Sequence, residues 1–148
     1  MGFFHAYRAG GGEPAIIESA ISGSKFSRGD ILQADVGSTI SKAGPNADTA
    51  DIFAIALADS NDSINALIPV LLPDMADVFL SDSTAGTAFV QGTEYDVDVS
   101  TASRHQVTSS VNTPRVVIVK ATGSVLGQSN DSRVLCKFIS HSGLIDLS

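Results

Sequence analysis

The sequence predicts an all-β protein, a single-domain antiparallel β-sandwich or β-barrel with an extended N-terminal arm. From Phe26 onward, short apolar runs are separated by turn residues, a pattern typical of sandwiches and barrels. Apolar residues at helical spacing are hard to find, and only the alanine-rich stretch from Asp51 to Asp59 offers a short helix as an alternative. The chain has 148 residues, of which 43% are hydrophobic, so it is long enough to bury one substantial core.

The arm is expected to span residues 1–23, and the β domain residues 24–148. Gly10-Gly11-Gly12 is followed by Glu13-Pro14, and this composition favours a flexible connection over a regular element. Large apolar side chains near the start of the arm are costly to expose, so we expect them to pack on this domain or on a neighbouring chain. The predicted partner contacts are Phe3, Phe4, Tyr7 and Arg8.

The first half of the domain predicts five strands, bounded by clear turn signals. Asp35-Val36-Gly37 reads as a turn between the first two, and Gly44-Pro45-Asn46 is a strong breaker after the second. Pro69 cannot donate to a ladder, which predicts a sheet edge or a bulge in the fourth strand. The expected strands are Gly29–Ala34, Thr39–Ala43, Ile52–Leu57, Leu67–Leu72 and Val78–Leu80.

The second half predicts four more strands. The run from Glu94 to Val99 alternates acids with Tyr95, Val97 and Val99, which places the acids on one face and the apolar residues on the other. The run from Arg115 to Lys120 is the richest in β-branched residues. The remaining expected strands are Ala88–Val90 and Arg133–Ser140.

Charge is unevenly distributed along the chain, whose formal net charge is −7. Between Ala43 and Ser103 there is no Lys or Arg, and all nine basic residues lie outside this stretch. Such a composition argues against nucleic acid or an anionic membrane as a partner, because binding either requires Lys or Arg to neutralise phosphates. The stretch is either a solvated surface or a face for a basic partner. Its acids are Asp48, Asp51, Asp59, Asp62, Asp74, Asp77, Asp82, Glu94, Asp96 and Asp98.

Catalytic motifs are weak or absent in the sequence. Ser22 and Lys25 have the Ser-x-x-Lys spacing of lysine-dependent serine hydrolases, but the companion Lys-Thr-Gly is missing. The histidines are scattered, and no His or Cys pair has zinc-ligand spacing. Cys136 lies in an apolar strand pattern and reads as a small buried hydrophobe. We therefore expect a protein that is not an enzyme, with no catalytic, metal-binding or cofactor-binding residues and no cofactor.

The tripeptide Arg28-Gly29-Asp30 is known as a cell-adhesion signal. Here it directly precedes Ile31 and Leu32, where the first strand of the domain is expected to begin. Glycine takes positive φ readily, and polar residues flank turns. The position therefore favours a structural turn over an adhesion ligand.

A resemblance emerges from the order of motifs between Lys25 and Val99. Phe26-Ser27-Arg28-Gly29-Asp30-Ile31 is followed by a turn, a small-residue strand and Pro69-Val70-Leu71-Leu72-Pro73. Asp77-Val78-Phe79 and then Gly92-Thr93-Glu94-Tyr95-Asp96-Val97 complete the series. This order resembles the small capsid decoration proteins of tailed bacteriophages, also called cement or head-stabilising proteins.

The resemblance implies a virion structural protein that binds the outside of the major capsid lattice and stabilises the head. Its expected partners are the major capsid protein and further copies of itself, as a homodimer or homotrimer. It would be made in the host cytoplasm, in agreement with the lack of a basic region and a long apolar run at the N-terminus. Alternatives are another phage structural β module, such as a tail or fibre component, and a small hydrolase or carbohydrate-binding domain.

Overall fold

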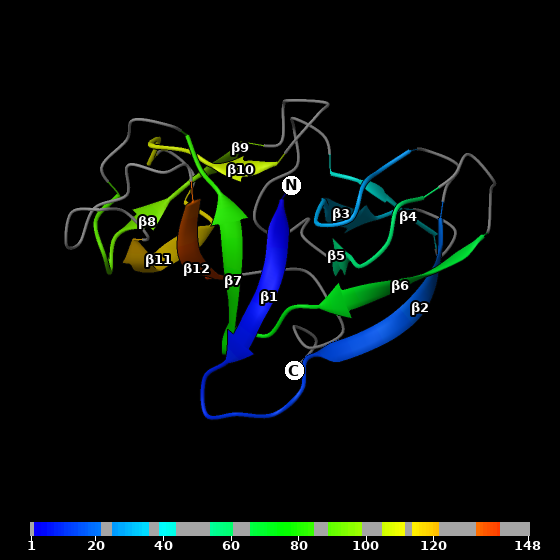
Figure 1. Ribbon diagram of the computed structural model, residues 1–148. Coiled ribbons are helices and arrows are strands. Elements are labelled where there is room, and N and C mark those ends of the chain that lie inside the picture. The colour runs from blue at the N-terminus through cyan, green and yellow to red at the C-terminus, as the bar shows by residue number, and fades with distance from the viewer. Residues whose placement is uncertain are drawn as a thin grey trace.

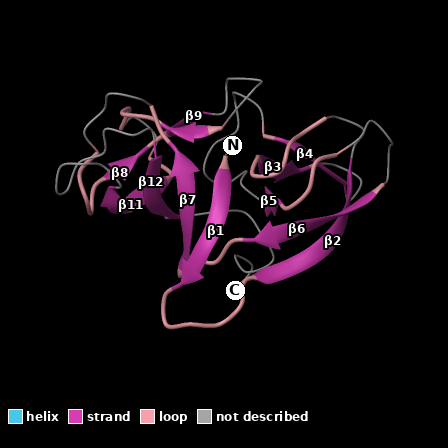
Figure 2. Ribbon diagram, viewed as in Figure 1, coloured by secondary structure: helices cyan, strands magenta, loops and turns pink. Residues whose placement is uncertain are grey.

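The computed structural model has no helix among the residues it describes, so the predicted all-β class is confirmed (Figure 2). The described residues are 2–21, 25–35, 39–43, 54–60, 66–84, 89–98, 105–111, 114–121 and 133–139. Their strands are β1 (Phe3–Arg8), β2 (Ala15–Ile21), β3 (Ile31–Ala34), β4 (Thr39–Lys42), β5 (Ala54–Ala56), β6 (Leu67–Leu72), β7 (Asp77–Asp82), β8 (Glu94–Tyr95), β9 (Val97–Asp98), β10 (Gln106–Val107), β11 (Val116–Ala121) and β12 (Arg133–Phe138).

The strands form a closed barrel beside an open sheet (Figure 1). The barrel has the order β2-β4-β3-β5-β6, and its pairs are antiparallel except for the parallel pair β2–β4. The sheet has the order β1-β7-β12-β11-β8, with antiparallel neighbours throughout. A small ribbon of β9 and β10 joins the end of β7 through a bridge between Ser83 and Val107.

Two hydrophobic cores follow from the alternation of side chains along the barrel strands. On β3, Leu32 points into the barrel, whereas its neighbour Ile31 belongs to the core under the sheet. Ile55 of β5 and Leu71 of β6 also face the sheet, while the residues on either side of each face the barrel interior. The outer wall of the barrel is therefore one half of the second core.

An aromatic cluster from the sheet completes that second core. Phe3 of β1 and Phe79 of β7 both contact Phe138 of β12, with ring centroids 5.3 and 5.4 Å apart. All three side chains are fully buried. Since each aromatic ring buries about 150–250 Å² of surface, this cluster is a main source of adhesion between the sheet and the barrel.

Two chain segments run side by side through both halves of the molecule (Figure 1). β1 pairs with β7 in the sheet, and the following strand β2 pairs with β6, which precedes β7, in the barrel. Between the two ladders, the Ala9 N–H donates to the Ala76 carbonyl at 2.7 Å, so the pairing continues through the turn region. Residues 3–21 and 67–82 thus form one interrupted antiparallel ribbon.

The predicted N-terminal arm is wrong, because residues 3–8 and 15–21 are strands of the fold. Phe3 is only 1% exposed, and β2 closes the barrel between β4 and β6. Gly10, Gly11 and Gly12 all have positive φ, so they form a turn between β1 and β2. The glycines signal a tight change of direction, and the local sequence does not reveal that both flanking segments have partners far along the chain.

Pro69 lies inside a barrel strand, contrary to the predicted edge or bulge. Strand β6 pairs with β2 on one side and with β5 on the other. The Leu57 N–H, just beyond β5, donates to the Pro69 carbonyl at 3.2 Å. The proline nitrogen therefore faces the end of β5, where no N–H is needed to continue the ladder.

The stretch predicted as one strand from Glu94 to Val99 is divided at Asp96. Tyr95 pairs with Val116 in the large sheet, whereas Val97 pairs with Val107 in the small ribbon. The predicted faces are still right for the described part, since Tyr95 and Val97 are buried and Glu94 is exposed. The chain changes sheet at Asp96, whose carboxylate accepts a hydrogen bond from the Ser110 hydroxyl at 2.6 Å.

Two further differences concern short elements. Phe89 and Val90 lie outside any strand, and Phe89 packs edge-on against Tyr95 with ring centroids 5.0 Å apart. Strand β10 was not predicted, because two residues give no periodicity. The rest of the predicted strands overlap with β3 to β7, β11 and β12.

Candidate functional site

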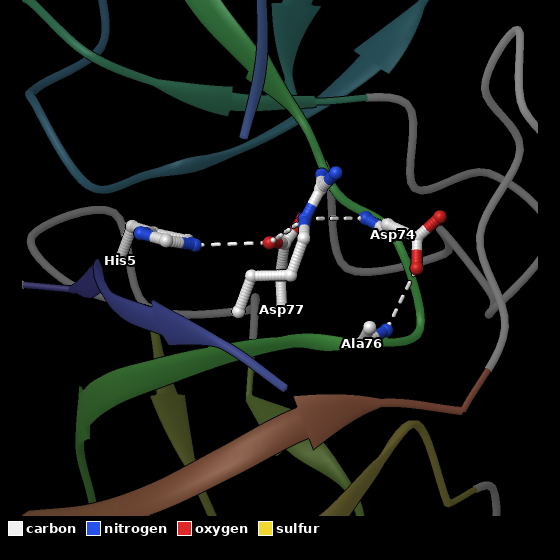
Figure 3. Close-up of polar contacts among 5 residues, drawn as sticks. His5, Asp74, Ala76 and Asp77 are labelled. Carbon is white, nitrogen blue, oxygen red and sulfur yellow. Dashed lines mark hydrogen bonds and ion pairs between the residues drawn. The ribbon is translucent and has the colours of Figure 1, made fainter. Parts of the chain in front are cut away.

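Asp77 connects β1 to the turn that precedes β7, and its side chain is fully buried. His5 Nε2 and Arg8 Nε each donate to Asp77 Oδ1 at 2.9 Å (Figure 3). The second oxygen accepts from an Arg8 terminal nitrogen at 3.1 Å and from the Asp74 backbone N–H at 2.9 Å. His5 and Asp77 are 72 residues apart, so no local sequence signal predicts this contact.

The charges around Asp77 stabilise its ionised form. Burial alone would raise the pKa of Asp77, but hydrogen bonds from Arg8, the Asp74 N–H and His5 outweigh burial and hold the pKa below its usual range. The hydrogen bond to Asp77 in turn raises the pKa of Arg8. A carboxylate whose two oxygens each accept two hydrogen bonds is suited to joining two strands, and it is poorly suited to transferring a proton.

The Arg28-Gly29-Asp30 segment is a turn into β3, as predicted. The Asp30 N–H donates to the Ser27 carbonyl at 3.0 Å, and Gly29 has a φ of +93°. The Gly29 N–H donates to the Ala56 carbonyl, and its own carbonyl accepts from the Phe3 N–H, both at 2.8 Å. The turn therefore holds β1 against the end of β5.

Asp30 is only 2% exposed, and this burial argues against an adhesion role. Its Oδ2 accepts from the Ser27 N–H at 2.8 Å and lies 3.4 Å from Lys42 Nζ. An adhesion ligand must present this carboxylate to a receptor, whereas here the carboxylate caps its own turn. Only Arg28 of the tripeptide is exposed, and its guanidinium lies over the Phe4 ring, 5.5 Å from the centroid.

His105 is fully buried beside the same turn and fixes the start of β3. The Ile31 N–H donates to His105 Nδ1 at 2.9 Å, so the neutral ring carries its proton on Nε2. Burial is the main reason that the pKa of His105 falls to about 4; Lys42 also lowers it, while Asp30 and Asp98 raise it. Among the described residues, Nε2 has no hydrogen-bond partner.

A cleft of about 120 Å³ lies where β1 meets the barrel. Its floor is formed by buried apolar side chains of both halves, including Phe3, Ile55, Leu71 and Phe79. Its rim has two basic side chains, His5 and Arg28, together with the partly exposed Phe4 and Leu57. The cleft thus combines an apolar interior with one permanently charged side chain, Arg28, at its edge.

The four predicted contact residues are distributed around this cleft and the Asp77 network. The prediction is wrong for Phe3, which is part of the core, and Arg8 is held by Asp77. Phe4 is partly exposed at the rim of the cleft, and Tyr7 is 48% exposed on β1. For Phe4, Tyr7 and Arg8 a role in partner contact stays a prediction. Sequence analysis missed Arg28, His5 and Leu57, which only the fold brings to the cleft.

The acidic stretch is not a uniform solvated face. Asp77 and Asp82 are buried, whereas Asp59 and Glu94 are exposed. Asp74, Asp96 and Asp98 have intermediate exposure, and Asp48, Asp51 and Asp62 lie outside the described residues. Several of these acids therefore stabilise turns within the chain, as the Asp74 carboxylate does by accepting from the Ala76 N–H at 2.8 Å.

The remaining chemical candidates do not come together in the described part of the chain. Cys136 is buried, and this burial raises the pKa of its thiol, which keeps it protonated and unreactive. Ser22 and His141 lie outside the described residues. No group of three or more potential metal ligands, and no helix able to cross a membrane, occurs within the described ranges.

No protein-family model matches this chain, and no curated protein matches it. The residues and their geometry therefore provide the basis for assigning a function.

Proposed function

We propose that this chain is a virion structural protein that binds the outside of the major capsid lattice of a tailed bacteriophage and stabilises the head. In this role its partners are the major capsid protein and further copies of itself, in a dimer or a trimer. It is made in the host cytoplasm and ends on the capsid surface. It needs no catalytic residue and no cofactor.

The observation that supports this proposal is the position of the residues that carry the resemblance. Gly29 and Gly92 both have positive φ at turns. Asp30, Asp77 and Tyr95 are buried at the junctions between strands. These residues carry the resemblance to the decoration proteins, and the role of those proteins is extended to this chain on that basis.

Attachment through many copies agrees with the modest surface features of the chain. The exposed large side chains include Tyr7 on β1, Ile16 on β2 and Leu67 on β6, with exposed fractions of 48%, 55% and 63%. Each gives only a small contact area. A lattice that holds hundreds of copies turns weak single contacts into lasting occupancy, because linked copies raise one another's effective concentration.

The direct test uses capsids of the phage that carries this gene, assembled without the protein. Purified protein is added, the capsids are pelleted, and the bound copies and the temperature of capsid disruption are measured. We expect saturable binding at a fixed ratio to the major capsid protein and a higher disruption temperature. Protein that stays in the supernatant at every concentration would contradict the proposal.

The location of the protein on the native particle distinguishes the capsid proposal from the tail or fibre alternative. Gold-labelled antibody against the protein is applied to native particles and imaged by electron microscopy. Label over the heads agrees with decoration of the capsid. Label confined to tails or fibres would instead assign the chain to those structures.

A further inference from the structure

The cleft between β1 and the barrel has a size that restricts what it can hold. Its volume of about 120 Å³ is well below the roughly 300–1,000 Å³ of small-molecule sites. It is close to the roughly 150 Å³ cavity that accommodates benzene. The cleft is therefore matched to one apolar side chain rather than to a whole metabolite.

The interior of the cleft favours a branched aliphatic or aromatic group. Ile55 and Leu71 contribute the wall of the barrel, and Phe3 and Phe79 contribute the sheet. All four are fully buried members of the same core, so the floor is fixed in place by packing on its far side. A preformed apolar floor lowers the ordering cost of binding.

The rim of the cleft adds a requirement for negative charge. Arg28 is exposed, and its guanidinium is positioned over Phe4 at 5.5 Å. The Arg28 backbone is held by a hydrogen bond from its N–H to Asp59 Oδ1 at 2.8 Å. Among the described residues, no carboxylate forms an ion pair with the guanidinium. A planar guanidinium in a fixed position is well suited to receive a carboxylate.

We propose that this cleft is a docking socket for one apolar side chain of a partner protein, with a partner carboxylate next to that side chain paired with Arg28. The proposal deepens the proposed function, and rests on it, in taking the partner to be the major capsid protein. Arg28 of the tripeptide then acts in recognition, while Gly29 and Asp30 hold its turn in place.

The first test measures the socket without any capsid. Isotope-labelled protein is titrated with isovalerate, which joins a leucine-like branched chain to a carboxylate, and separately with 3-methyl-1-butanol, its uncharged analogue. We expect saturable amide shifts that centre on residues 3–5, 28 and 55–57. We also expect isovalerate to bind about three to five times more tightly than the alcohol, which is the upper part of the range for an exposed ion pair.

Variants then test separately the charge of Arg28 and the open space at the mouth of the cleft. Arg28→Gln should remove the preference for isovalerate, while Lys120→Gln, which removes an exposed positive charge on β11, should leave it unchanged. Leu57→Phe should fill the mouth and weaken both probes. Amide shifts that do not saturate would contradict the socket proposal. A preference for isovalerate that persists in Arg28→Gln would contradict it as well.

The second test uses the bare capsids. If wild-type protein binds them, Arg28→Gln and Leu57→Phe should each reduce the bound copies, and Lys120→Gln should not. Equal binding by all four proteins would overturn the socket and leave the proposed function standing. If wild-type protein fails to bind capsids, the proposed function falls, and the probe titration alone decides whether the socket exists.

Discussion

At the scale of single residues, the buried polar side chains of this protein hold turns and strand ends in place. Asp30 accepts a hydrogen bond from the Ser27 N–H and lies near Lys42. Asp77 accepts hydrogen bonds from the side chains of His5 and Arg8. A buried carboxylate is tolerated only when such partners offset its desolvation. Removing one of these carboxylates should therefore cost more than removing the exposed charge beside it.

Asp30 and Arg28 provide a matched comparison within one turn. Asp30→Ala leaves the Ser27 N–H without its acceptor, so we expect a loss of about 2 kcal/mol in the free energy of unfolding. Arg28→Ala removes only a cation–π contact and should cost less than about 1 kcal/mol. Urea denaturation of both variants measures the difference. Equal losses would show that the buried carboxylate has no special structural role.

His105 should make the stability of the protein depend on pH. Its pKa is about 4 in the folded protein, against a usual value of 6.5, so the unfolded chain takes up the proton first as the pH falls. The stability contributed by the neutral ring is present above pH 6.5 and is lost progressively as the pH falls from there towards 4. The charged groups that face the ring are Asp30, Lys42 and Asp98.

The variant that checks this effect is His105→Asn, because asparagine keeps an acceptor for the Ile31 N–H but does not titrate. Urea denaturation at intervals from pH 7 to pH 4.5 should show a steeper fall in stability for the wild type than for the variant. Parallel curves for the two proteins would rule out His105 as the source.

At the scale of elements, the turns decide where strands meet. Gly2 and Gly29 lie in contact, and a Cβ added at Gly2 would come within 2.4 Å of the Gly29 carbonyl oxygen. Only two glycines facing each other allow β1 to approach the turn so closely. This contact brings the cleft and its rim together, and it depends on backbone shape more than on side-chain chemistry.

Gly29 and Gly92 separate the effect of backbone conformation from that of close contact. Both have positive φ, +93° and +80°, so alanine at either position should cost about 1 kcal/mol. At Gly29 the new Cβ would also lie 3.2 Å from the Phe3 nitrogen, whereas at Gly92 nothing lies within 4 Å. We expect Gly29→Ala to shift the thermal midpoint clearly more than Gly92→Ala does. A larger shift for Gly92→Ala would contradict the described contact.

The sequence predicted the strands whose apolar pattern is local. Leu67–Leu72 has the same bounds as β6, and the tripeptide turn lies where it was expected. It did not predict β1 and β2 as strands, because their partners β7 and β6 are distant in the chain and the intervening glycines imitate a linker. The cleft was missed for the same reason, since Arg28 and Leu57 reach it from separate segments.

At the scale of the whole molecule, the barrel and the sheet share a core and a ribbon. Leu71 and Ile55 lie on the barrel wall but pack with Phe3 and Phe79 of the sheet. The sheet therefore has no complete apolar core without the barrel, and the apolar outer wall of the barrel is left uncovered without the sheet. This arrangement predicts that the two halves unfold together.

Calorimetry tests this cooperativity. We expect one transition whose calorimetric and van't Hoff enthalpies agree. Leu71→Ala should lower the stability of the whole protein by about 2–5 kcal/mol and keep a single transition, because the cavity lies between the halves. Two separate transitions, in the wild type or in the variant, would show that the halves are independent.

The pairing of β1 with β7 also constrains how the protein folds during its synthesis. His5 and Asp77 are 72 residues apart, so ribosomes working at about 5–20 residues per second need roughly 4–14 s to produce the partner. Throughout that interval, Phe3 has no native ladder to join, and until β6 emerges β2 has only its short parallel pairing with β4. A nascent chain of this kind spends its most aggregation-prone period before β6 and β7 emerge, and its abundance depends on how well the cell shields the chain during that interval.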